Sequence, residues 1–347
     1  MVVKPHFGSW ISISTLDSLG EYILISMETP WKLIKSKITN RPSRIIFNDN
    51  MSFEHLNRLF LGLQSLISEG YSIVGLGGGT ACDTAKFLSW KFKEESDYNL
   101  ELILIPSIIS VDAFLCSSIA VRMDNKVRYI GETQPKEILI DYELIKMAPK
   151  FLNRAGVSDT ISISSALGDW KIERDEMDGY FDQKIFDSAK EIASDLMKAR
   201  YDIRDLTKKG IDAIVNGFYR EVKLCEDWGN ARPEEGSEHF LAYCIEAITR
   251  DHYIHGNLIG MTILVSLELQ GNYAEFSIDE IQQFFKDIKI TIKPQRQKIS
   301  SLNIKNALRN IQNFVKEENL QYSIYNSPKL ILNAIKIEEI VKFLEEL

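Results

Sequence analysis

The feature that most constrains the fold is an alternation of short apolar segments with amphipathic ones between residues 40 and 140. Three apolar segments have the length and composition of strands that are buried on both faces. They are residues 44–47, 72–76 and 101–105. Residues 53–66 and 80–92, which separate them, carry apolar side chains at helical spacing. Buried strands separated by helices indicate a parallel sheet covered on both faces, an architecture typical of nucleotide-binding domains.

Two later segments, residues 127–130 and 137–140, are also extended in character. We expect them to form a strand pair, and we expect a turn at Asp124 and Asn125 between extended segments.

The pattern changes after about residue 148, where Ala, Glu, Lys and Leu at helical spacing continue to the C-terminus. With 347 residues, the chain is long enough for two domains. We therefore predict an α/β domain with a parallel sheet over residues 1–148 and an all-helical domain over residues 149–347.

The composition excludes several classes of function. Lys and Arg number 41 against 49 Asp and Glu, which gives a net charge of −8 without a dense basic run. Binding to nucleic acid or to an anionic membrane surface is therefore not expected.

The four cysteines form no CxxC pair, which fits a reducing cytoplasm. We find no signal peptide and no apolar stretch of membrane-spanning length, so we predict a cytoplasmic protein.

A glycine-rich loop, Gly77-Gly78-Gly79, lies between a predicted strand and a predicted helix. Glycines allow close approach of a ligand, and the free amides at a helix start attract anionic oxygens such as those of a pyrophosphate. The spacing matches neither GxGxxG nor the Walker loop. The alternative is a glycine-rich turn that binds nothing.

Asp49 follows the first predicted strand, where an acidic side chain can accept hydrogen bonds from an adenosine ribose. This role favours NAD over NADP. The alternative is that Asp49 and Asn50 cap the helix that begins near Phe53.

Three of the five histidines, His239, His252 and His255, fall within 17 residues. Two imidazoles and one carboxylate would form a three-ligand site with open positions, as expected of a catalytic divalent metal. Asp159 is our candidate carboxylate because it opens the helical half beside Gly156. The alternative is that the histidines lie on the surface or in the core without a metal.

Several separated motifs resemble one superfamily, that of iron-containing alcohol dehydrogenases, glycerol dehydrogenases and dehydroquinate synthases. Residues 77–86 resemble its GGGxxxDxAK signature. Residues 155–159 with the later Asp169-Trp170 resemble the AGxGD and DW motifs of the sn-glycerol-1-phosphate dehydrogenase branch. Residues 232–239 resemble the RPxSGxEH motif of that branch, and His255-Gly256 its HG[EQ] motif.

The resemblance implies a dinucleotide-binding domain, a helical domain and a cleft between them. It also implies one Zn²⁺ or Fe²⁺ ion held by the residues that match Asp159, His239 and His255. Glu238 is a candidate partner that would orient an imidazole. His252 matches no ligand of the family pattern, and we assign it a candidate role as a proton relay.

For the nucleotide, the resemblance implies that Gly77, Gly78 and Gly79 cradle the pyrophosphate of NAD or NADP. Asp83 and Lys86 would flank the nicotinamide end. Ser107 corresponds to a loop that contacts the nucleotide in the family.

The loop after the third predicted strand departs from the family pattern. The dehydrogenase branch has S-H-D-G-x-A-S-P there, whereas residues 110–117 read S-V-D-A-F-L-C-S. Ser110 and Asp112 match, while Val111 and Phe114 bring apolar side chains into a loop that faces the substrate in the family. Asp112 is therefore our candidate catalytic residue, because its carboxylate can accept hydrogen bonds from substrate hydroxyls.

These observations predict a metal-dependent NAD(P)(H) oxidoreductase that interconverts a small polyol, phosphorylated polyols included, and its ketone. We expect it to form a homo-oligomer. One alternative is a dehydroquinate synthase-like cyclase or lyase that uses NAD transiently, although those enzymes carry Glu at the position of Asp159. The other alternative is a catalytically degenerate nucleotide-binding protein.

Overall fold

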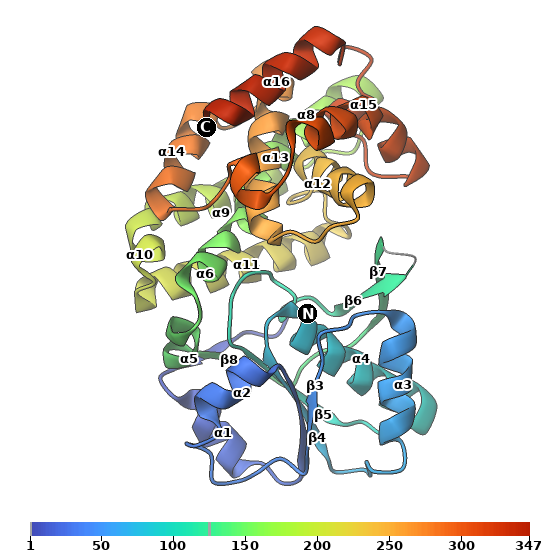
Figure 1. Cartoon of the computed structure of the whole chain (residues 1–347), viewed down its shortest axis with the longest axis vertical. Helices are drawn as coiled ribbons and strands as arrows, with labels where there is room; N and C mark the ends of the chain where they lie inside the picture. The colour runs from blue at the N-terminus through green and yellow to red at the C-terminus, as the bar shows by residue number, and fades with distance from the viewer. Residues whose placement is uncertain (1, 124–125) are drawn as a thin grey trace. The chain divides into compact units, whose positions relative to one another are not determined.

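The computed structural model describes residues 2–123 and 126–347, and the chain divides into two compact units. The first is Met1–Asn153 and the second is Arg154–Leu347. Figure 1 shows a sheet with flanking helices in the first unit and a set of helices in the second.

A six-stranded parallel sheet forms the centre of the first unit, in the order β1-β8-β5-β4-β2-β3. Its strands are β1 (His6–Gly8), β2 (Tyr22–Ser26), β3 (Arg44–Phe47), β4 (Ser72–Gly77), β5 (Glu101–Pro106) and β8 (Glu137–Asp141). The helices of this unit are α1 (Ile11–Ser18), α2 (Glu28–Ile34), α3 (Phe53–Leu63), α4 (Gly79–Ser96) and α5 (Tyr142–Met147), and α6 (Lys150–Ala155) leads into the second unit.

Successive residues of β4 face opposite sides of the sheet, as expected for an extended strand. Val74 and Leu76 pack in one apolar cluster with residues of α1 and α2. Gly75 points the other way, and a Cβ at this position would lie 2.9 Å from the Cβ of Ala85 in α4. A glycine at position 75 therefore allows α4 to lie directly on the sheet, as the view in Figure 1 indicates.

The predicted fold class is confirmed. The three predicted strands correspond to β3, β4 and β5, and the two predicted helices correspond to α3 and α4. Strand β2 was not predicted, although its five residues are all buried and it pairs with both β3 and β4.

The expected pairing of residues 127–130 with residues 137–140 is wrong. Strand β7 (Lys126–Glu132) pairs antiparallel with β6 (Ser118–Met123), whereas β8 joins the main sheet in parallel to β5 and β1. The physical reason is that β8 is apolar and buried, which suits an interior parallel strand, while β7 is largely exposed. Asp124 and Asn125, the predicted turn, lie outside the described residues.

All regular elements from residue 154 onward, a range that the structure describes completely, are helices, as predicted. The α-helices are α7 (Val157–Ile161), α8 (Ile163–Met177), α9 (Gln183–Lys198), α10 (Arg200–Asp205), α11 (Lys208–Trp228), α12 (Ser237–Thr249), α13 (His255–Gln270), α14 (Ile278–Ile288), α15 (Ser301–Glu317) and α16 (Ala334–Glu346). Three short 3₁₀ helices are η1 (Gly271–Tyr273), η2 (Pro294–Gln297) and η3 (Ile324–Asn326).

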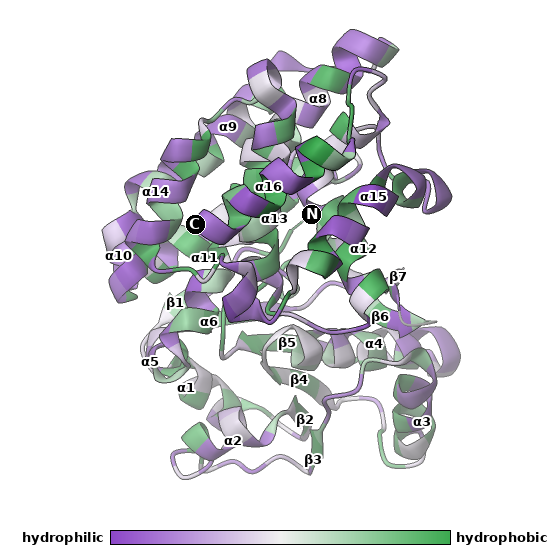
Figure 2. Ribbon diagram, turned by 45° about the horizontal axis from the view of Figure 1, so that its top comes forward, coloured by the Kyte–Doolittle hydropathy of each residue, from purple (hydrophilic) through white to green (hydrophobic). Residues whose placement is uncertain are grey.

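Helix α13 forms the core of the second unit, since its residues from Gly256 to Leu267 are all buried. A helix that is apolar on every side belongs inside a domain, whereas outer helices are amphipathic. Figure 2 shows this difference, with hydrophilic and hydrophobic residues mixed along α14 and α16. Among the described residues, no helix has the length and apolar character that crossing a membrane requires. No disulfide joins the four cysteines.

Candidate functional site

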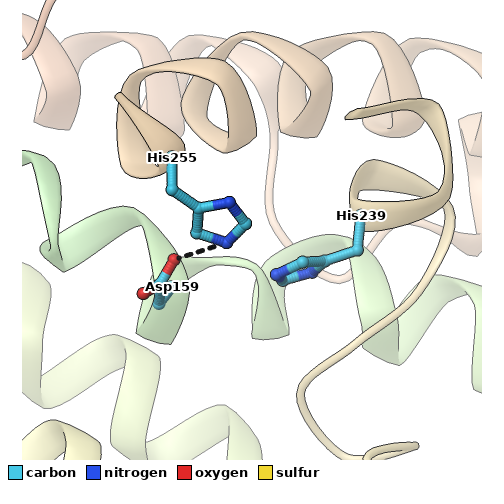
Figure 3. Close-up of side chains that lie close together, drawn as sticks. All are labelled: Asp159, His239 and His255. Carbon is cyan, nitrogen blue, oxygen red and sulfur yellow. Dashed lines mark ion pairs between the residues drawn. The ribbon is translucent and has the colours of Figure 1, made fainter. Parts of the chain in front are cut away.

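Three predicted metal ligands from three different helices lie together in the second unit. Asp159 belongs to α7, His239 to α12 and His255 is the first residue of α13. One ligand atom of each lies within 4.8 Å of the others. The Nε2 atom of His255 is 3.3 Å from Oδ1 of Asp159, and the two imidazole centroids are 5.5 Å apart. In Figure 3 the carboxylate and both rings point toward one common space, an arrangement that suits a divalent metal with open positions.

Gly256 explains why His255 lies beside Asp159. A Cβ at position 256 would lie 1.8 Å from the carbonyl oxygen of Ala155. The start of α13 is therefore in direct backbone contact with the segment that leads into α7. Only glycine permits this approach, which explains why a glycine follows His255 in the motif.

The start of α12, which carries His239, is fixed by a carboxylate from α8. Asp169 accepts hydrogen bonds from the backbone amides of Ser237 and Ile324, each at 2.7 Å. A Cβ at Gly236 would lie 2.5 Å from Oδ2 of Asp169, so this residue too allows a close approach. Burial raises the pKa of Asp169 to about 6, against the lowering effect of the charge on Arg232.

The electrostatics of the cluster favour a cation. Burial lowers the pKa of His239, but the hydrogen bond from its ring to Glu238 and the charges of Glu235, Glu238 and Asp159 outweigh this and raise it to about 9. Burial and the nearby charge of His239 lower the pKa of His255. The acidic side chains around His239 thus favour a positive charge at this ring.

The predicted glycine loop lies in the first unit, where β4 ends and α4 begins. Strands β2 and β4 are neighbours in the sheet. After β2 the chain continues to β3 on one side of this pair, and after β4 it continues to β5 on the other side. The carboxyl ends of β2 and β4 therefore form a topological switch point. Ligands of open α/β sheets bind at such points. Helix α4 has no side-chain hydrogen bond at its N-cap, Gly78, which leaves its first amides suited to an anion.

Packing against the loop after β5 also explains why positions 78 and 79 are glycines. A Cβ at Gly78 would lie 3.0 Å from a methyl of Ile108, and one at Gly79 would lie 3.0 Å from a methyl of Val111. The loop after β5 is therefore pressed against the glycine loop. The backbone amide of Ser107 donates to the carbonyl of Gly77 at 2.9 Å, which places this predicted nucleotide contact beside the loop.

Asp83 and Lys86, predicted to flank the nicotinamide, form a buried ion pair of 2.7 Å. The ammonium of Lys86 also donates to the carbonyls of Cys116 and Ser118, at 3.1 Å and 2.7 Å. Three protein acceptors match the three ammonium hydrogens. Lys86 thus ties α4 to the segment that follows the predicted substrate loop, and its contact with the nucleotide stays a prediction.

In the predicted substrate loop, Asp112 accepts a hydrogen bond from the thiol of Cys116 at 2.8 Å. Phe114, expected to face the substrate, is only 2% exposed. Its ring therefore belongs to the interior of the protein, while Asp112 retains some exposure.

Two predicted residues are exposed. Asp49 follows β3, and the capping alternative for it is wrong because the N-cap residue of α3 is Ser52. The side chain of Asn50 accepts a hydrogen bond from the Ser52 amide at 2.8 Å instead. His252 lies in the connection between α12 and α13, and its role as a proton relay stays a prediction.

Comparisons with known proteins agree with the motifs. Residues 22–149 match the family model described as iron-containing alcohol dehydrogenase. Over 199 residues, 57% of this chain, it is 25% identical to glycerol-1-phosphate dehydrogenase [NAD(P)+] of Saccharolobus islandicus. Over 238 residues, 68% of this chain, it is 27% identical to the protein of the same name from Thermoplasma volcanium. The matched stretches span 55% and 64% of those two relatives.

The fold is also that of solved structures of the superfamily. Glycerol dehydrogenase from Schizosaccharomyces pombe superposes with a TM-score of 0.68 at 18% identity, covering 97% of this chain and 86% of that one. The resemblance drawn from the motifs is therefore confirmed: the chain is similar to iron-containing alcohol dehydrogenases over residues 22–149 and to curated proteins named glycerol-1-phosphate dehydrogenase.

Proposed function

We propose that this protein is a metal-dependent oxidoreductase that uses NAD or NADP to interconvert a small polyol, or polyol phosphate, and its ketone. The observation that carries the proposal is the convergence of Asp159, His239 and His255 from three helices. The names of the curated relatives, which include the nucleotide, support the substrate class and the cofactor. The cytoplasmic location and the homo-oligomer stay predictions from the sequence.

The donor set fits the metal that the family name implies. Asp159, His239 and His255 would hold one zinc or iron ion, and the anionic carboxylate would offset part of its charge. When bound, such an ion supplies Lewis acidity at the oxygen of the substrate. Three protein ligands leave coordination positions for that oxygen, which distinguishes a catalytic site from a structural one.

The residues of the first unit would bind the nucleotide. The amides at the start of α4, around Gly78 and Gly79, would hold the pyrophosphate, with Ser107 beside them. Asp49 would accept hydrogen bonds from the ribose. The nicotinamide supplies the hydride acceptor or donor.

Asp112 would accept a hydrogen bond from a substrate hydroxyl, because its carboxylate is partly exposed in a loop that contacts the glycine loop. The thiol of Cys116 donates to this carboxylate and would hold its orientation. His252, in the connection that precedes the ligand His255, would exchange the hydroxyl proton with solvent.

The test is a screen of free and phosphorylated polyols with metal-replete protein, with nicotinamide absorbance as the signal. We expect reduction of NAD or NADP with at least one polyol, and none with the His239→Ala variant. Turnover of a cyclic or phosphorylated substrate without net change in nicotinamide absorbance would favour the cyclase alternative. Protein that binds neither metal nor any polyol would favour the degenerate alternative.

A further inference from the structure

The carboxylate of Glu238 is completely buried at the start of α12, yet it is surrounded by donors. Its Oε1 atom accepts from the backbone amide of Gly236 at 2.7 Å and lies 2.9 Å from Nδ1 of His239. Its Oε2 atom accepts from the hydroxyl of Ser165 at 2.7 Å. A buried carboxylate is costly unless it is hydrogen-bonded, and these three donors satisfy that requirement.

The donor of the Oε2 contact is itself held in place. Ser165 belongs to α8, and its carbonyl accepts from the side-chain amide of Gln270, at the end of α13, at 2.8 Å. Helices α8, α12 and α13 thus meet around Glu238. The side chain therefore has one orientation relative to the helix that carries His239.

This orientation decides which nitrogen of His239 is available. Both carboxylate oxygens of Glu238 already act as acceptors, toward the Gly236 amide and the Ser165 hydroxyl, so we assign the hydrogen of the contact with His239 to Nδ1. The lone pair that can bind a metal is then on Nε2. Histidine ligands of metals commonly donate their second nitrogen to a carboxylate, which sets the tautomer and the ring orientation.

We propose that Glu238, held by Ser165 and Gly236, is a positioning residue that fixes His239 in the tautomer whose Nε2 binds the metal. The inference rests on the proposed metal site and adds the buried residues on which its affinity depends. It also explains why an acidic residue precedes His239 at a position where no solvent reaches it.

Three substitutions separate the parts of this arrangement. Glu238→Ala removes the acceptor, and we expect zinc affinity to fall by about 10- to 100-fold, the range seen for such partners. Glu238→Gln keeps an oxygen for Nδ1 and an amide for Ser165, so it should recover most of that loss. Ser165→Ala should weaken zinc binding by only a few-fold. Glu246→Gln, the same chemical change near the other end of α12, is the matched control and should bind zinc like the wild type.

Zinc affinity is measured by competition with a chelating dye, after thermal unfolding has shown that each metal-free variant is folded. A second readout is the Nδ1 proton of His239 in the NMR spectrum of zinc-loaded protein labelled at histidine. Its low-field, exchange-protected signal should persist in the Gln variant and vanish in the Ala variant. A merely structural role of Glu238 would not produce this pattern.

The outcomes separate the two proposals. Wild-type protein that binds no zinc would overturn the proposed metal site and this inference with it. Wild-type protein that binds one zinc per chain, with unchanged affinity and Nδ1 signal in the Ala variant, would overturn the role of Glu238 and leave the metal site standing. Should the Ala variant fail to fold, a Gln variant that loses as much affinity as His239→Ala would contradict the expected recovery.

Discussion

Replacing Gly256 by alanine should disrupt the metal site without touching a ligand. The added Cβ would lie 1.8 Å from the Ala155 oxygen and 2.4 Å from its carbonyl carbon. Both are backbone atoms, so no side-chain rotation relieves the contact. The start of α13 and the segment before α7 must separate by about 1.2 Å to reach even the 3.0 Å below which real Cβ contacts essentially never occur.

That separation acts directly on two ligands. His255 adjoins the substituted residue, and its Nε2 is now 3.3 Å from Oδ1 of Asp159. Metal–ligand distances tolerate deviations of only about 0.2 Å. We therefore expect Gly256→Ala to lower zinc affinity by about 100-fold or more, and overpacking should lower the free energy of unfolding by about 1–3 kcal/mol.

The matched control is Gly260→Ala, one turn further along α13. Its Cβ would meet the side chains of Ile292 and Ser158 at 3.0 Å and 3.1 Å, and side-chain atoms can shift. The free energy of unfolding, measured with urea, should change by less than about 1 kcal/mol in this variant, and its zinc affinity should stay within a few-fold of the wild-type value. Equal zinc affinity in wild type and Gly256→Ala would refute the argument that backbone contact positions His255.

Three further predictions address other parts of the molecule. Asp112→Ala should lower kcat/KM by about 100-fold while zinc and nucleotide binding persist, since the lost carboxylate contacts the Cys116 thiol and would contact substrate, but neither the metal nor the nucleotide; wild-type turnover would contradict this. Gly78→Ala places a methyl against Ile108 and at the first amides of α4, so nucleotide affinity measured by fluorescence should fall at least about 10-fold, and unchanged affinity would mean that the loop is only a turn. Asp169 has its pKa raised from 3.8 to about 6, so its contribution to the free energy of unfolding is fully present below about pH 4 and lost as the pH rises through about 6. The difference in unfolding free energy between wild type and Asp169→Asn should therefore decrease by up to about 3 kcal/mol over that range, and a flat difference would show that the pKa is not raised.

The local sequence pattern is sufficient to predict strands whose side chains are buried on both faces of the sheet. Strand β4 is buried throughout and mostly apolar because helices cover both faces of the sheet, and the same pattern predicts β3 and β5. Strand β2, Tyr22–Ser26, carries an equally clear apolar run, so the same pattern predicts it. The partner of β8 could not be predicted, because pairing depends on contacts between segments far apart in the chain.

The candidate site likewise depends on contacts between segments far apart in the chain. Motifs identified Asp159, His239 and His255, and the structure brings them together. The reasons for their placement are long-range and left no local signal. Gly256 is needed because of Ala155, about 100 positions earlier in the chain, and the acceptor of the Ser237 amide is Asp169 on another helix. The burial of Phe114 likewise depends on the packing of its loop against the rest of the protein.

The most direct test of the central claim is reconstitution of metal-free protein. Metal is removed with a chelator, zinc or ferrous ion is added in steps, and nicotinamide reduction with the active polyol is followed at each step. We predict no turnover without metal and a linear rise that ends at about one equivalent per chain, with no recovery in the His239→Ala variant. Full turnover by the metal-free protein would contradict the assignment of Asp159, His239 and His255 as the catalytic metal site.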